Sequence, residues 1–118
     1  MFNAEKIVDT IEIKVLVRIT QADGSAYDGD FTGVFKKPTQ DQLDAAIDEG
    51  WKNSEVLDEY LVGVKGIGRT ATEPMPSDEA LALVKKTPEC VSAACVAFFQ
   101  KFAPERYNAK TSRKQRGG

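Results

Sequence analysis

A strict alternation of side chains near the N-terminus constrains the fold of this chain more than any other feature. From residue 11 to residue 19 every odd position is isoleucine or valine, whereas the even positions are Glu12, Lys14, Leu16 and Arg18. A period of two places successive side chains on opposite faces, so the segment predicts a strand with one buried face. Leu16 is the apolar exception on the polar face, and we interpret it as a candidate second contact surface.

A turn and a returning strand follow this segment. Asp23-Gly24 is typical of a hairpin turn, because glycine accepts the positive φ that such turns require. Phe31, Gly33 and Phe35 then alternate with more polar positions. The sequence therefore predicts a β-hairpin over about residues 10–37, which must pack on helices because one hairpin is marginal alone.

Helical spacing replaces the alternation beyond residue 38. Thr39 and Gln42 form a capping-box pattern that starts a first helix, and Gly50 ends it. Further helix starts are predicted at Asn53 or Ser54, at Pro76-Ser77 and at Thr87-Pro88. We therefore predict a single α+β domain over residues 1–107. In it an N-terminal β-hairpin packs on a small bundle of about four helices between about residues 40 and 103.

The charge of the chain is unevenly distributed. Residues 101–118 contain six Lys and Arg and one acid, whereas the first 100 residues contain ten bases and seventeen acids. Residues 108–118 hold Ala109 as their one apolar side chain, so they cannot bury enough surface to offset their ordering entropy. We predict a flexible, disordered basic tail there. Solubility or weak electrostatic contact explains such a tail more simply than nucleic-acid binding.

Composition argues against most catalytic and metal sites. The chain has no histidine, which removes the commonest general base and zinc ligand. Cys90 and Cys95 are five residues apart, a spacing typical of neither a redox pair nor a metal site. The glycines of residues 63–68 lack the order of a phosphate-binding loop, and we interpret them as a helix end and turn. We therefore predict no enzymatic activity, no cofactor and no metal.

The chain shows no pattern of a membrane or secreted protein. No apolar run reaches the roughly 18 residues that a membrane span needs, and the first ten residues lack the apolar core of a signal peptide. We therefore expect a cytosolic protein. Its dense carboxylates fit a solvated face better than a cation site, and that face could meet a basic partner such as a neighbouring copy's tail: Asp41, Asp44, Asp48, Glu49, Glu55, Asp58 and Glu59.

The clearest amphipathic stripe lies near the C-terminus. Its apolar residues recur at helical spacing: Val91, Ala94, Cys95, Phe98, Phe99 and Phe102. Core packing is the common role of such a stripe, but three phenylalanines exceed the needs of a small bundle, which indicates self-association. We expect a surface for self-association or for a client on this stripe or the second helix, with these candidate protein-binding residues: Leu57, Tyr60, Leu61, Val91, Cys95, Phe98, Phe99 and Phe102.

The order of these segments resembles the tail assembly chaperones of long-tailed bacteriophages and prophages. The resemblance covers about residues 30–116. It rests on the strand-to-helix segment 35–44, the Leu- and Val-rich helix that runs into the glycine turn at 55–67, and the serine-capped helix after Pro76. The proline break at Pro88, the aromatic helix to Phe102 and the short basic tail complete it. Val64 stands where the family commonly has an aromatic residue.

The resemblance implies a role in tail morphogenesis. Such chaperones coat the tape measure protein, a long and largely helical chain with apolar surface, and keep it soluble while the tail tube assembles. The tape measure protein would be the main partner, the tail tube protein a second one, and the chaperone itself a homo-oligomer. The protein would act in the cytoplasm of the bacterial host and be absent from the mature virion.

Two other classes of function remain open at this point. One is a structural tail or head–tail connector protein, which would stay in purified virions. The other, less favoured, is a small nucleic-acid-binding regulator that uses the basic tail, although the acidic body argues against a nucleic-acid groove.

Overall fold

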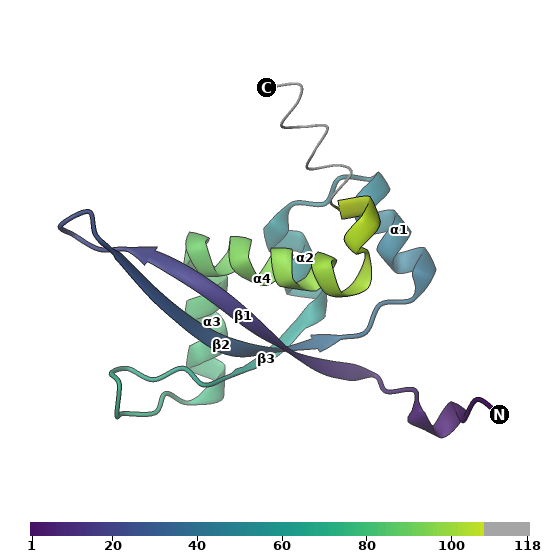
Figure 1. Ribbon diagram of the computed structural model, residues 1–118, viewed down its shortest axis with the longest axis horizontal. Coiled ribbons are helices and arrows are strands. Elements are labelled where there is room, and N and C mark those ends of the chain that lie inside the picture. The colour runs from purple at the N-terminus through teal and green to yellow at the C-terminus, as the bar shows by residue number, and fades with distance from the viewer. Residues whose placement is uncertain (108–118) are drawn as a thin grey trace.

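The structure is a computed structural model that describes residues 1–107 (Figure 1). Its elements, in chain order, are the 3₁₀ helix η1 (Ala4–Lys6), β1 (Thr10–Thr20), β2 (Ala26–Lys36), α1 (Gln40–Asp48), α2 (Asn53–Tyr60), β3 (Leu61–Lys65), α3 (Ser77–Lys86) and α4 (Pro88–Phe102). The predicted α+β fold, an N-terminal hairpin packed on four helices, is confirmed. The predicted basic tail, residues 108–118, lies outside the described residues.

The hairpin forms as the alternation predicts. β1 and β2 pair antiparallel from Thr10 opposite Lys36 to Thr20 opposite Ala26. Gly24 adopts φ +85°, and the carboxylate of Asp23 accepts a hydrogen bond of 2.9 Å from the amide of Ser25. The Asp-Gly turn thus sets the register that brings the apolar positions of both strands onto one face.

The glycine-rich run contains a third strand that the sequence did not predict. α2 ends at Tyr60, and Leu61–Lys65 forms β3, which pairs antiparallel with β2. Leu61, expected on the face of the second helix, is instead buried in this strand opposite Phe35. A strand of five residues that directly follows a helix offers too short a period to be recognised. The predicted turn comes after the strand, at Gly66, where φ is +82°.

The helix starts follow the local chemistry of the sequence. The Thr39 hydroxyl accepts from the Gln42 amide at 3.2 Å, and the Gln42 side chain accepts from the Thr39 amide at 2.9 Å, which confirms the capping box. α2 begins differently. Its N-cap is Lys52, whose amide donates to the Glu55 carboxylate at 3.0 Å, so the two predicted caps are the first helical residues.

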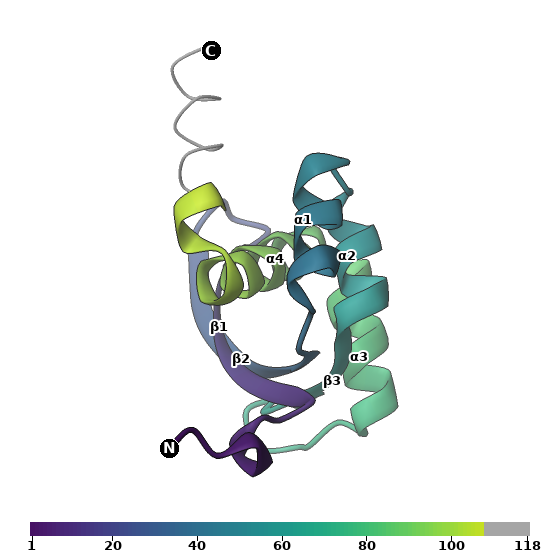
Figure 2. The same ribbon diagram turned by 90° about the vertical axis from the view of Figure 1, so that its right-hand side faces the viewer.

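The helices pack on one face of the curved sheet (Figure 2). α4 lies along β1 and contacts α2 and α3, while α3 lies against β3. Phe98 of α4 occupies the centre of this core, with its ring centroid 5.5 Å from that of Phe35 and 5.1 Å from that of Tyr60. Gly33 is required beside them, because a Cβ there would approach the Phe35 ring to 2.6 Å.

Two parts of the chain extend beyond this core. Residues 1–9 are exposed and precede β1 as an arm that contains η1. At the other end of the sheet, the hairpin turn reaches past the helices, and residues 20–28 are exposed (Figure 1). The helices therefore cover the middle of the hairpin and leave its turn end uncovered.

Candidate protein-binding surfaces

The side chains predicted to bind a partner lie in the core. Six of them are at most 8% exposed, namely Leu57, Tyr60, Leu61, Cys95, Phe98 and Phe99, and two are half-buried, namely Val91 and Phe102. A partner that bound them would have to replace contacts inside the core, so the exposed apolar residues elsewhere offer the more accessible surface.

The aromatic side chains of α4 are occupied by contacts within the chain. The Phe98 and Phe102 ring centroids are 5.0 Å apart. Phe99 stacks on Tyr107 with a centroid distance of 5.5 Å and an angle of 8° between the planes. The three-stranded sheet and the turn after α4 thus cover the aromatic side chains that exceed the needs of a small helical bundle.

Neither cysteine has the environment of a nucleophile. Both are free thiols. Burial raises the pKa of Cys95 to about 12, and its Sγ donates to the carbonyl of Asn53 at 3.3 Å. Burial, followed by the charge of Glu89, also raises the pKa of Cys90. Raised pKa values keep both groups protonated at neutral pH, whereas a reactive cysteine needs its thiolate.

The carboxylates of the first two helices form ion pairs with basic side chains from later segments of the chain. Arg106 pairs with Asp44 and Asp48 of α1. Asp58 of α2 pairs with Lys85 of α3 at 3.7 Å. Within residues 1–107 no group of three or more carboxylate or thiol side chains could hold a metal ion. These carboxylates join helical segments and lie at the surface.

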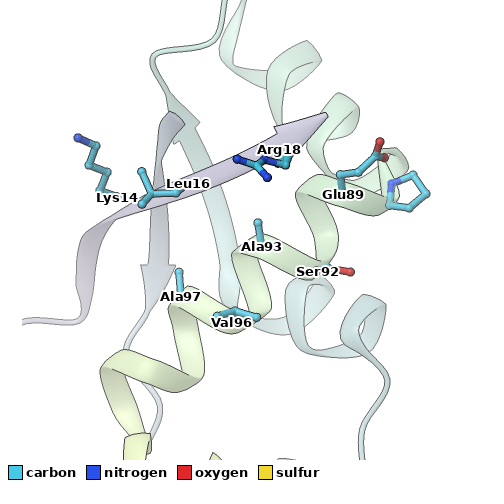
Figure 3. A pocket seen from close by; sticks show the side chains of 9 residues that line it. Lys14, Leu16, Arg18, Glu89, Ser92, Ala93, Val96 and Ala97 are labelled. Atoms are coloured by element: carbon cyan, nitrogen blue, oxygen red, sulfur yellow. The ribbon is translucent and has the colours of Figure 1, made fainter. Parts of the chain in front are cut away.

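A groove of about 730 Å³ runs between β1 and α4 (Figure 3). Lys14, Leu16 and Arg18 form one wall, on the outer side of the strand. Ala93 and Ala97 point toward β1 from α4. Leu16 is 72% exposed, so the apolar exception noted in the sequence does lie at an open surface.

A larger hollow of about 870 Å³ lies under the turn end of the hairpin. Ile19 and Tyr27, which are opposite each other in the register, line it from the strands. Leu83 of α3 and the loop 66–74 close the other sides. The hollow therefore continues the apolar face of the hairpin toward its turn, between the strands and the ends of α3 and α4.

Most of the exposed apolar side chains are divided between the N-terminal arm, the groove and the hollow. Among residues 1–107, the exposed large apolar residues are Met1, Phe2, Ile7 and Val8 in the arm, Leu16 and Val96 in the groove, Tyr27 and Leu83 in the hollow, and Val62 apart from both. The sequence pattern indicates Leu16 as a contact surface, whereas Tyr27 is not among the residues expected from it. The signal was available, because the turn at Asp23-Gly24 pairs Tyr27 with Ile19.

No helix within residues 1–107 combines the length and hydropathy needed to cross a membrane. Comparison of the chain with protein-family models, with curated proteins and with solved structures finds no match. The function is therefore inferred from the sequence pattern and from the surfaces of this α+β fold.

Proposed function

We propose that this chain is a tail assembly chaperone of a long-tailed bacteriophage or prophage. It binds the tape measure protein without catalysis, keeps it soluble in the cytoplasm of the bacterial host and promotes tail tube assembly, and it is absent from the mature virion. One structural observation carries the proposal, together with the resemblance of the sequence. An apolar hollow large enough for side chains of a partner lies beside the hairpin.

The hollow suits the apolar face of a helix. Tyr27 is 59% exposed and Leu83 is 41% exposed, and they lie among the residues that line it. An amphipathic helix binds such a groove through apolar side chains at helical spacing, and a tape measure protein is expected to present many of them. A contact this small gives modest affinity at each site, which suits a partner that must later be released.

The charge of the described residues favours solubility of the complex. Residues 1–107 hold 12 Lys and Arg against 18 Asp and Glu, a net charge of -6. Copies arranged along an aggregation-prone client would present this acidic surface to solvent, and like net charge opposes further association.

Co-expression with the proposed client, a tape measure protein from the same phage or prophage, tests the proposal. We expect the client to be insoluble alone and to co-purify as a soluble complex with many copies of this chain, measured by pull-down and light scattering. Leu83→Lys should abolish recovery of soluble client, because it places a charge in the hollow.

Val62→Lys is the matched control, because Val62 is 47% exposed and lies outside both the hollow and the groove. It should recover the client as the unchanged chain does. A client that stays insoluble with the unchanged chain contradicts the chaperone function. Equal recovery with both variants contradicts the placement of the site.

A further inference from the structure

One edge of the sheet is open. Within residues 1–107 the strand order is β1-β2-β3, so β1 pairs with β2 on one side and with no strand on the other. The Lys37 amide donates to the Asp9 carbonyl, and the Gln21 amide donates to the Ser25 carbonyl. Hydrogen-bonded pairs alternate along an antiparallel ladder. The backbone N–H and C=O groups of the odd residues of β1 therefore point toward β2. The even residues present their N–H and C=O groups to the open edge.

The groove between β1 and α4 gives access to this edge. Lys14, Leu16 and Arg18, all even residues, line it from the strand, and the small side chains of Ala93 and Ala97 line it from the helix (Figure 3). Small side chains leave room for the backbone of an added strand. An open strand edge beside a helix is a geometry suited to β-strand addition.

We propose that the added strand is β1 of a second copy of this chain, paired antiparallel about a twofold axis at Val15. Thr10 then lies opposite the partner's Thr20, and all 11 residues of the strand overlap. In this register even residues meet even residues, so the backbone groups on both open edges bond to one another.

Charge selects this register over its neighbours. Glu12 lies opposite the partner's Arg18, and twofold symmetry repeats this pair. A shift of one pleat in one direction places Lys14 opposite the partner's Lys14, and a shift in the other direction places it opposite the partner's Arg18. Like charges directly opposite each other destabilise a strand pair. A slip that exchanged odd and even residues would turn the apolar face outward.

The ion pairs within each copy extend the same pattern. Lys65 pairs with Glu12, and Arg18 donates to Asp28 at 2.8 Å. In the dimer, Lys65, Glu12, the partner's Arg18 and the partner's Asp28 would alternate in sign across the joined sheet. Their side chains are 52% to 72% exposed, so these pairs select the register and add little affinity.

The half-buried isoleucines of the apolar face contribute to the attraction. Ile11 would lie opposite the partner's Ile19, and Ile13 opposite the partner's Val17, which is already buried in its own core. β-branched pairs of this kind stabilise neighbouring strands. On the outer face Leu16 would cover the aliphatic stem of the partner's Lys14 and lose much of its exposure to water.

This dimer uses a different surface from the proposed client site. Its interface is centred on the edge of β1 and the groove, whereas the client would enter the hollow under the turn end; Val17 and Ile19 lie at the border of both. Loss of one therefore need not remove the other, and the inference stands or falls without the proposed function.

Charge exchange between two variants tests the register. Glu12→Arg alone places arginine opposite arginine, and Arg18→Glu alone places glutamate opposite glutamate, so each should weaken self-association by about tenfold or more. An equimolar mixture restores opposite charges at both symmetric positions, and a heterodimer should form. Sedimentation velocity of each variant, of the mixture and of the unchanged chain measures this. Circular dichroism and thermal unfolding verify that both variants fold.

A second variant tests the backbone pairing. The Leu16 amide faces the open edge, so Leu16→Pro removes a bond between copies and none between β1 and β2. We expect a folded monomer. An unchanged chain that is monomeric at every concentration overturns the proposal, as does a dimer that survives both single charge variants. Failure of the mixture to form a heterodimer overturns the register.

Discussion

The middle of the hairpin and its turn end have the same alternating sequence pattern, but they differ in exposure to solvent. Val15 and Phe35 are completely buried, because α4 and the residues around Tyr60 pack over them. Ile19 and Tyr27 continue the same face toward the turn, yet Tyr27 is 59% exposed at an open hollow. Alternation thus determines which side chains share a face, and the length of the covering helices determines which of them become core.

In the helical part of the molecule, the relation between sequence pattern and exposure is reversed. The stripe of α4 is the strongest apolar signal in the sequence, and almost all of its side chains are packed in the core. The weaker signals, a single leucine on a polar strand face and a tyrosine near a turn, mark the accessible surfaces. In a chain of this size, strong periodicity indicates the core, and isolated exceptions to it indicate where a partner can bind.

The largest expected change in the free energy of unfolding comes from a substitution in the covered region. Phe98→Ala removes a fully buried ring at the centre of the core, and it should lower the free energy of unfolding by about 3–5 kcal/mol. Chemical denaturation followed by the single tryptophan, Trp51, measures this, because Trp51 lies beside Tyr60 in the same core.

The matched change in the open region is Leu16→Ser. Its side chain is 72% exposed, so the free energy of unfolding of the monomer should change by about 0.5 kcal/mol or less. Measured at a concentration where the chain is monomeric, a large loss for Leu16→Ser or a small one for Phe98→Ala would contradict the assignment of the two regions.

A smaller effect comes from pH. Burial raises the pKa of Cys95 in the folded chain from 9.0 to about 12, so the folded state keeps a proton that the unfolded state releases. This contribution to stability is present below about pH 9 and is lost as pH rises toward 12. The free energy of unfolding should therefore fall with alkaline pH, and Cys95→Ala should remove much of the fall.

Two other groups, Tyr60 and Cys90, also make the free energy of unfolding depend on alkaline pH. Burial raises the pKa of Tyr60 above its ordinary value near 10, and burial raises the pKa of Cys90 above 9. The Cys95→Ala variant should thus keep a shallower alkaline dependence. An identical pH profile in both proteins would show that the Cys95 thiol reaches water as readily in the folded chain as in the unfolded one.

Local signals in the sequence were sufficient to predict the hairpin and its turn, the capping box at Thr39 and the proline start of α4. They failed for β3, since five residues after a helix give no clear period. They also failed to separate core from surface on α4. That distinction depends on which other elements pack against the stripe, and those contacts join residues far apart in the chain, such as Phe35 and Phe98.

The client site that we propose at the turn end of the hairpin can be located by hydrogen exchange. Amide exchange should be compared between the free chain and its co-purified complex with the tape measure protein. We expect new protection in residues 18–28, the loop 66–74 and the end of α3 around Leu83, with little change in α4, whose core face is already buried. Protection confined to α4 and α2, with the hairpin end unchanged, would contradict it.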